Sequence, residues 1–197
     1  MRGAFLIAFN LFSPHQQHKA LNWPDQPLNQ DFCVTNNDIL RRLRYTFDFD
    51  DKKMIALFAA ADLTVTREQV SNWLKKEEDP AYEACHDKLF ATFLNGFIND
   101  RRGKKEGAQP EPEKRLNNNI ILRKLKIALN LKDDDMLAVM ALAPFRMSKP
   151  ELSALFRKPG HKHYRQCQDQ ILRNFLKGLQ EKHRPSPKPE TGFQWKT

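Results

Sequence analysis

Residues 157–165, Arg-Lys-Pro-Gly-His-Lys-His-Tyr-Arg, contain six Lys, Arg and His side chains, more than any other nine-residue stretch of the sequence. Proline and glycine favour a loop here, and its basic side chains could contact phosphate or an acidic protein, with Tyr164 able to stack on a base. The segment 82 residues earlier, 75–83, is acidic but also carries a tyrosine, Tyr82. The shared tyrosine favours a structural role, whereas the charge distinguishes the two segments.

A metal site is the second chemistry that this loop suggests. His161, His163 and Cys167 have a His-x-His-x3-Cys spacing that could offer three ligands. Cys85 occupies the position equivalent to Cys167 without those histidines, and a shared buried thiol explains both cysteines more simply. We therefore predict no metal and no cofactor.

Basic residues also recur on one expected helix: Arg41, Arg42 and Arg44 correspond to Arg123, Lys124 and Lys126. The first and third residues of each triplet lie on the same helical face as an asparagine, which is Asn37 in the first copy and Asn119 in the second. A phosphate could bridge such a face, and binding would then weaken steeply with salt. A solvated helix face with cations toward the helix C-terminus explains the pattern equally well.

A corner between two expected helices resembles a helix-turn-helix, with an apolar helix from Asp51, a connection through residues 60–65 and a capped helix after it. The exposed residues of that second helix are Arg67, Asn72 and Lys75, or Lys149, Arg157 and Lys158 in the later copy. The connection is longer than the compact motif uses, and any small helical bundle contains such a corner. The pattern leaves both interpretations open.

These patterns together predict a non-enzymatic binding protein whose partner is DNA or RNA. The candidate contact residues are Arg41, Arg44, Arg101, Arg102, Lys104, Lys105, Arg123, Lys126, Lys149, Arg157, Lys158, His161, Lys162, His163 and Arg165. The alternative is a protein-protein interaction adaptor that uses the groove between the two repeats, which an exposed apolar patch there would indicate. Catalysis is not expected, because the sequence has no glycine-rich phosphate loop, GxSxG or HExxH motif, and its acidic residues cluster where helices begin.

A tandem duplication must position these residues. Residues 36–44 and 118–126 are alike, and the 82-residue offset keeps matching residues aligned as far as Gly96 and Gly178. Each copy has four amphipathic segments with apolar residues at helical spacing. The sequence therefore predicts an all-α fold of two tandem four-helix units with helix-turn-helix-like corners, packed together because one copy alone is near the lower size limit for a stable core.

The expected boundaries follow from this duplication. Residues 1–34 form an extension that is disordered or precedes the true start, 35–100 the first repeat, 101–117 a basic and then Pro/Glu-rich linker, 118–184 the basic second repeat, and 185–197 a disordered tail. Val34 is a candidate start, because a GTG codon is read as methionine at initiation but as valine in a longer translation.

Local signals predict how the helices begin and pack. Asn36 or Asn37 is the expected N-cap of the first helix, and Thr66 opens a capping box. The fourth helix is expected from near Asp87 to Asn99. Gly96 and its equivalent Gly178 lie inside helices, where glycine costs about 1 kcal/mol relative to alanine. Because glycine occurs at this helical position in both copies despite its cost, we expect another helix to pack closely against it.

Charge separates the two copies. The chain has 197 residues and a formal net charge of +9. Residues 118–184 hold 14 basic and 6 acidic residues, whereas 36–98 hold 9 and 11. A polyanionic partner should therefore lie on the second repeat and the linker. Three cysteines without CxxC spacing favour a reducing, cytoplasmic location, and no apolar run suggests a membrane span.

Several long segments resemble the bacterial YehS-like family, whose members contain a twofold repeat of a domain of unknown function. The similar segments are the Asn36 opening NNDILRRLRY, VSNWLKKEEDP from Val70, KKEGAQPEPEKRL from Lys104, NNIILRKLKIALNLKDDD from Asn118 and FRKPGHKHYRQCQDQILRNFLKGL from Phe156. The resemblance covers about residues 35–184. It implies a start close to the Asn-Asn pair, in agreement with Val34, and it implies no activity or functional residues.

Overall fold

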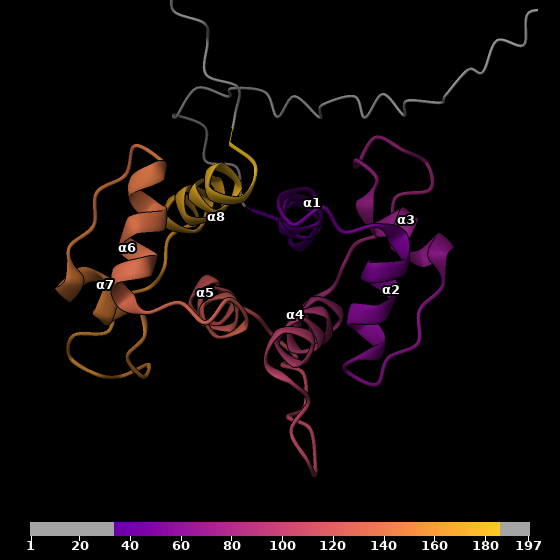
Figure 1. Cartoon of the computed structure of the whole chain (residues 1–197), viewed down its shortest axis with the longest axis horizontal. Helices are drawn as coiled ribbons and strands as arrows, with labels where there is room; N and C mark the ends of the chain where they lie inside the picture. The colour runs from indigo at the N-terminus through magenta and orange to yellow at the C-terminus, as the bar shows by residue number, and fades with distance from the viewer. Residues whose placement is uncertain (1–33, 186–197) are drawn as a thin grey trace, which may run out of the picture. The chain divides into compact units, whose positions relative to one another are not determined.

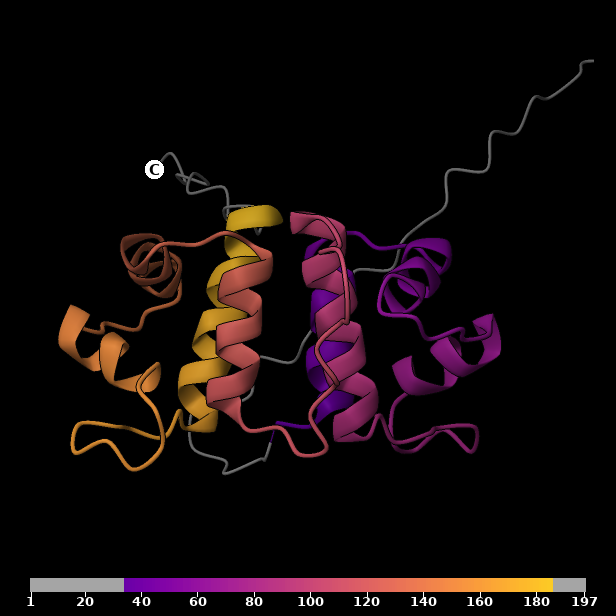
Figure 2. The same ribbon diagram turned by 90° about the horizontal axis from the view of Figure 1, so that it is seen from below.

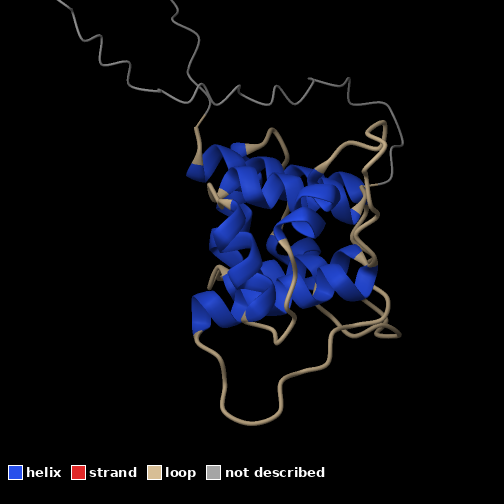
Figure 3. Cartoon of the chain, turned by 90° about the vertical axis from the view of Figure 1, so that its right-hand side faces the viewer, coloured by secondary structure: helices blue, strands red, loops and turns tan. Residues whose placement is uncertain are grey.

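A computed structural model describes residues 34–185 of the chain. The predictions of a disordered or mis-assigned N-terminal extension, residues 1–34, and of a disordered tail, residues 185–197, lie outside that range except at residues 34 and 185. Within it, the secondary structure consists of helices and loops (Figure 3). The prediction of an all-α protein is therefore confirmed. None of the helices from residue 34 to residue 185 has the length and apolar character needed to cross a membrane.

The described residues form eight helices, four in each repeat. Their bounds are α1 Asn36–Thr46, α2 Asp51–Ala59, α3 Arg67–Leu74, α4 Asp87–Arg102, α5 Asn118–Ala128, α6 Asp133–Leu142, α7 Lys149–Leu155 and α8 Asp169–His183. Helix α4 extends past the predicted end at Asn99, so Arg101 and Arg102 belong to its last turn and not to the linker.

The helix starts agree with the sequence signals in type, though not always in position. Thr35 and Asn117 are the N-caps of α1 and α5, so the prediction that Asn36 or Asn37 caps α1 is wrong. The expected capping box at Thr66 is present, and the equivalent residue of the second repeat, Ser148, also forms one. Asn36 and Asn37 are instead directed toward other elements, because the residue before them already satisfies the first turn.

Four helices, α1, α4, α5 and α8, form a central parallel bundle (Figures 1 and 2). At one end, the side-chain amide of Asn36 donates to Asp87 Oδ1 over 2.8 Å, and that of Asn118 donates to Asp169 Oδ1 over 2.6 Å. The C-termini of all four helices meet around one cavity at the other end. The peptide dipoles of the four helices therefore point in the same direction.

The repeats exchange contacts through this bundle. Helix α1 packs on α8, and α4 packs on α5, so each repeat places its first helix against the last helix of the other. The equivalent helices lie diagonally opposite one another, which gives the bundle an approximate twofold axis along its length (Figure 1). Two hydrogen bonds from a backbone N–H to a carboxylate also join the paired helices: Val34 N donates to Asp169 Oδ2 over 3.2 Å, and Leu116 N donates to Asp87 Oδ2 over 2.9 Å.

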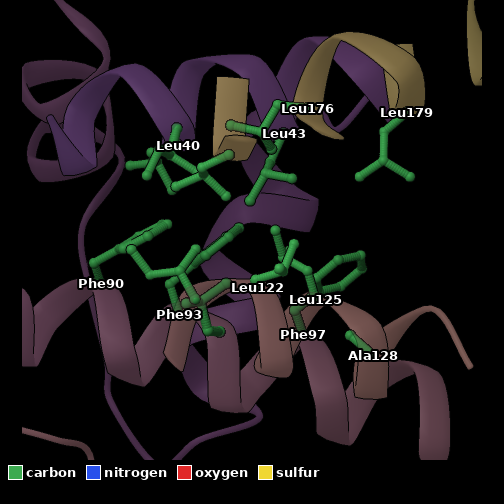
Figure 4. Packing of buried hydrophobic residues seen from close by; sticks show 14 of the residues in the cluster. Leu40, Leu43, Phe90, Phe93, Phe97, Leu122, Leu125, Ala128, Leu176 and Leu179 are labelled. Atoms are coloured by element: carbon green, nitrogen blue, oxygen red, sulfur yellow. The ribbon is translucent and has the colours of Figure 1, made fainter. Parts of the chain in front are cut away.

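A single hydrophobic core joins the two repeats. Leucines of α1 and α8 face phenylalanines of α4 and apolar residues of α5 across the centre of the bundle (Figure 4). The labelled residues are Leu40, Leu43, Leu176, Leu179, Phe90, Phe93, Phe97, Leu122, Leu125 and Ala128, each 3% exposed or less. The prediction that the two units pack together is confirmed by this shared core.

The outer helices pack on the bundle through the two predicted glycine contacts. A Cβ atom on Gly96 of α4 would lie 1.7 Å from Leu57 O of α2, and a Cβ atom on Gly178 of α8 would lie 1.9 Å from Val139 O of α6. The backbones of α2 and α6 thus occupy the space of a side chain. The predicted close approach of another helix is confirmed at both positions.

The second half of the linker packs against both repeats. Glu113 forms an ion pair with Lys124 Nζ of α5 over 2.9 Å, and Lys124 also donates to Asn95 Oδ1 of α4 over 2.5 Å. Lys124 is 9% exposed, so this pair is largely removed from water. The linker therefore supplies the counter-charge that a buried lysine between α4 and α5 requires.

Candidate nucleic-acid interface

The repeated Asn-Asn pair organises each repeat internally. The side-chain amide of Asn37 donates to the carbonyl oxygens of Trp73 and Glu83, both over 2.8 Å. Its Oδ1 accepts from the Tyr82 hydroxyl over 3.2 Å and from Cys85 N over 2.9 Å. Asn37 is 3% exposed, so it ties the end of α3 and the loop before α4 to α1 from inside the protein.

The second repeat contains the same four hydrogen bonds. Asn119 donates to Leu155 O and Arg165 O over 2.8 and 2.9 Å, and accepts from the Tyr164 hydroxyl and Cys167 N over 3.2 and 2.9 Å. The structural role predicted for Tyr82 and Tyr164 is thereby explained. Because the Tyr164 hydroxyl is directed at Asn119 inside the loop, its ring is part of the loop's support and is not presented for stacking on a base.

The four predicted contact residues on α1 and α5 have partners within the chain. Arg41 donates to Lys75 O over 2.6 Å and pairs with Asp38, and Arg123 donates to Phe156 O over 2.8 Å. Both arginines thus satisfy carbonyl groups where α3 and α7 end. Arg44 pairs with Asp51 over 2.7 Å, and Lys126 pairs with the equivalent Asp133. The recurrence of these cations is therefore explained by structural contacts.

The polar side chains at the corner formed by α2 and α3 also have partners within the chain. Arg67 pairs with Asp51 over 2.8 Å, Asn72 donates to Glu83 Oε1 over 3.1 Å, and Lys75 pairs with Asp79 over 3.5 Å. In the second repeat Lys149 pairs with Asp134 over 2.7 Å, which raises the pKa of this exposed lysine. A nucleic acid would have to compete with these carboxylates to reach α3.

The α7–α8 loop, residues 157–165, differs from all of these sites. Its C-terminal end is attached to the protein, since Arg165 N donates to Ala154 O over 3.1 Å and Arg165 O accepts from Asn119. Phe156 O, just before the loop, accepts from Arg123 over 2.8 Å. Within the loop, Lys158, Lys162 and Arg165 are exposed. Among residues 34–185, none of these three side chains, nor Arg157, lies within ion-pair distance of a carboxylate. The loop is therefore a fixed backbone that carries uncompensated positive charge.

The histidines of the α7–α8 loop lie beside one another at its tip. The ring centroids of His161 and His163 are 5.7 Å apart, and His161 Nδ1 accepts from His163 N over 3.1 Å and lies 3.4 Å from Arg157 Nη1. Cys167 is 1% exposed, and burial, with the neighbouring Asp169, raises the pKa of its thiol to about 12. Cys85 is buried with a pKa raised to the same extent by burial and by Asp87. The shared buried cysteine predicted for the two repeats is confirmed.

The remaining predicted residues lie elsewhere. Lys104 pairs with Asp62 over 2.5 Å, and Lys105 is exposed beyond the end of α4. Arg101 and Arg102 lie at the cavity where the bundle ends. The α7–α8 loop instead flanks the opposite end, next to the starts of α5 and α8 (Figure 2). The fifteen predicted contact residues thus divide between structural pairs, the α7–α8 loop and the cavity end, with Lys105 apart from all three.

Sequence reasoning missed the cavity and the buried Lys124 pair. The cavity is formed by residues that follow four separate helices, and no local pattern in the sequence brings these segments together. Lys124 was grouped with the basic helix face, yet it points inward toward Asn95 and Glu113. The nearby Pro/Glu-rich linker was the one available signal, since it supplies a carboxylate next to a cation-rich helix.

Comparison with known proteins agrees with the duplicated architecture. The family described as "Protein of unknown function (DUF1456)" matches residues 36–103 and again residues 118–184. The chain belongs to this family. The chain is 46% identical to "Uncharacterized protein YehS" of Escherichia coli (strain K12) over 147 residues, which is 74% of this chain and 94% of that protein. The resemblance to YehS-like proteins is thereby confirmed. No solved structure matches the chain.

Proposed function

We propose that this DUF1456 protein is a non-enzymatic, cytoplasmic nucleic-acid-binding protein whose α7–α8 loop contacts the phosphate backbone. The observation that carries the proposal is the uncompensated charge of that loop. Arg157, Lys158, Lys162 and Arg165 have no carboxylate partner among residues 34–185, and the sequence has no acidic residue between Glu151 and Asp169. Phosphate contacts by such side chains supply most of the affinity in sequence-independent nucleic-acid binding.

Contrast within the chain supports this proposal. The equivalent loop of the first repeat carries Glu77, Glu78 and Asp79, and its Lys75 is paired with Asp79. The two loops have the same supporting asparagine network, so the difference in charge is not required by the fold. A surface that differs in charge on an otherwise shared scaffold is where a binding function is expected.

The adaptor alternative has less support from the geometry. Away from the C-terminal end of the bundle, where both repeats line an open cavity, the space between the repeats is filled by the shared core (Figure 4). Among the described residues, the large hydrophobic side chains that are exposed are Ile127, at 45%, and Leu142, at 51%, and they lie on different helices. An adaptor groove would need a continuous apolar patch.

The proposal is tested by mobility shifts of the full chain with duplex DNA and with single-stranded RNA at two salt concentrations. A variant with Arg157→Gln, Lys158→Gln, Lys162→Gln and Arg165→Gln is expected to bind about tenfold or more weakly at low salt. The slope of log affinity against log salt should fall by about 3, since roughly one counterion is released for each phosphate neutralised.

The matched control removes the same number of charges elsewhere, at Lys52, Lys76, Lys88 and Lys177, all of which are exposed. This control should retain most of the affinity. Absence of binding at low salt, or equal weakening by both variants, would overturn the proposal. Binding of RNA but not DNA, or the reverse, identifies which nucleic acid the loop contacts.

A further inference from the structure

The C-terminal end of the bundle contains an open cavity of about 690 Å³ that both repeats build. Phe47 and Arg101 come from the first repeat, whereas Leu129, Leu131 and Lys182 come from the second. These residues follow or end four different helices, so the cavity exists only when the two repeats are packed together. Its volume is within the range of small-molecule sites.

The cavity carries more positive charge than is needed to offset the partial negative charges of the four helix C-termini. Arg101, Arg102, Lys182 and Arg184 contribute four positive charges, and Asp48 contributes one negative charge. Asp48 is already paired with Arg184 over 3.1 Å. Four parallel helices end here, and each C-terminus is equivalent to roughly half a negative charge, about two units together. Part of the positive charge therefore offsets the helix ends, and a positive surplus is left.

Three of these cations are available to a ligand. Within residues 34–185, Arg101, Arg102 and Lys182 have no carboxylate within ion-pair distance. Arg101 lies over the rings of Phe47 and Phe97, with its Cζ atom 5.7 and 5.5 Å from their centroids. These contacts orient the guanidinium and leave its N–H groups to donate, an arrangement suited to phosphate oxygens.

The cavity also offers an apolar wall beside the cations. The ring of Phe47 lies against Phe49, Phe97 and His183, with centroid separations of 5.6, 5.4 and 4.8 Å. Leu129 and Leu131 complete this wall from the second repeat. Aromatic rings of this kind can stack with a planar ligand. The combination of a cationic and an aromatic wall selects for a ligand with a phosphate at one end and a planar group at the other.

We propose that this cavity binds a small phosphorylated molecule with an aromatic ring, of the nucleoside monophosphate class, through Arg101, Arg102 and Lys182 on the phosphate and Phe47 beside the ring. This site is separate from the α7–α8 loop, so it goes beyond the proposed contact with a nucleic-acid backbone. It would allow the protein to bind a nucleotide and a polymer at opposite ends of the bundle.

Protonation of the His183 imidazole can report the binding of a negatively charged ligand. Partial burial, Lys182 and Arg101 lower the pKa of its imidazole. The charged groups around it are Arg101 and Arg102 from α4, Lys182 from α8, Arg184 after α8, and Asp48 after α1. A phosphate placed among these cations would favour the protonated imidazole, so binding should be accompanied by proton uptake.

The experiment is isothermal titration of the full chain with adenosine monophosphate, inorganic phosphate and adenosine, near pH 7 in two buffers of different ionisation enthalpy. Adenosine monophosphate should bind more tightly than phosphate or adenosine. Arg101→Gln with Arg102→Gln should weaken its binding about tenfold or more, since each charge-assisted contact contributes at least that factor. Proton uptake should disappear in His183→Gln.

Two controls separate this proposal from the others. Arg102→Gln alone alters an exposed side chain that forms no ion pair within residues 34–185, and it should still weaken binding, which excludes unfolding as the cause. Arg157→Gln with Lys158→Gln removes equal charge from the α7–α8 loop and should leave nucleotide binding unchanged. Absence of adenosine monophosphate binding at millimolar concentration, equal binding of adenosine, or equal weakening by the loop variant would overturn the proposal.

Discussion

Asn37 and Asn119 supply hydrogen bonds that the loops around them cannot form with their own backbone. Each side chain joins two carbonyl groups, one backbone N–H and one tyrosine hydroxyl that lie 36 to 48 residues further along the chain. A buried backbone group without a partner costs about 1–3 kcal/mol. A single asparagine therefore fixes the loop before the fourth helix of each repeat, including the α7–α8 loop that carries the candidate interface.

Replacement of this asparagine should be costly. We expect Asn37→Ala to lower the free energy of unfolding by about 3 kcal/mol, because two carbonyls and the Cys85 N–H lose their partner in a buried site. Asn36→Ala is the matched control, since Asn36 is only partly buried and its hydrogen bonds to Cys85 O and Asp87 Oδ1 are also only partly buried. It should cost about 1 kcal/mol. Urea unfolding measures both variants, and equal losses would contradict the role assigned to Asn37.

Most of the helices, but only part of the interface, could be predicted from the residues. Capping boxes and apolar stripes are local, so the starts at Thr66 and Ser148 were predictable. Whether a cation is already paired depends on groups distant in sequence, as with Arg41 and Lys75 O. The candidate contact residues predicted from the pattern therefore include cations that already have partners within the fold.

At the scale of helices, the pair Gly96 and Gly178 sets how closely the outer helices approach the bundle. The two contacts are equivalent, with α2 against α4 and α6 against α8. A stripe of apolar residues indicates which side of a helix is buried, whereas it does not indicate the partner helix. The glycines predicted a close contact, but only the structure shows that the parallel central helices pair across the repeats.

Gly96→Ala and Gly178→Ala should each destabilise the protein despite the better helix propensity of alanine. Propensity favours alanine by about 1 kcal/mol, but the added Cβ would overlap a backbone oxygen that cannot move without shifting a whole helix. We expect a net loss of about 2 kcal/mol or more in urea unfolding. Gly160→Ala is the control, because Gly160 has open space and only a positive φ of 87° to oppose the change. A stabilised Gly96→Ala variant would contradict the packing described.

For the molecule as a whole, the exchange of helices makes each repeat incomplete. Leu40 and Leu43 of the first repeat lie beside Leu176 and Leu179 of the second, and Phe90, Phe93 and Phe97 line the same core (Figure 4). A repeat alone would expose this surface to water. The duplication thus reproduces, within one chain, the arrangement of a symmetric dimer.

A fragment of residues 34–103 should therefore form a homodimer in which α1 of each copy packs on α4 of the other. Size-exclusion chromatography with light scattering should give twice the fragment mass, with helical circular dichroism. Leu40→Asp in the same fragment should abolish both dimer and helicity, because a carboxylate would be buried at the shared core. A folded monomeric fragment would contradict this account of the repeats.

The parallel direction of the four central helices also has a mechanical consequence. Val34 enters the bundle beside the start of α8, and Arg184 leaves it at the opposite end, where it binds Tyr45 O and Asp48 after α1. Tension applied through the two chain ends would pull α1 and α8 along each other in opposite directions. Their contacts would be loaded in shear, many at once, instead of being peeled apart one at a time. The fold is therefore expected to resist stretching far better than two repeats joined end to end.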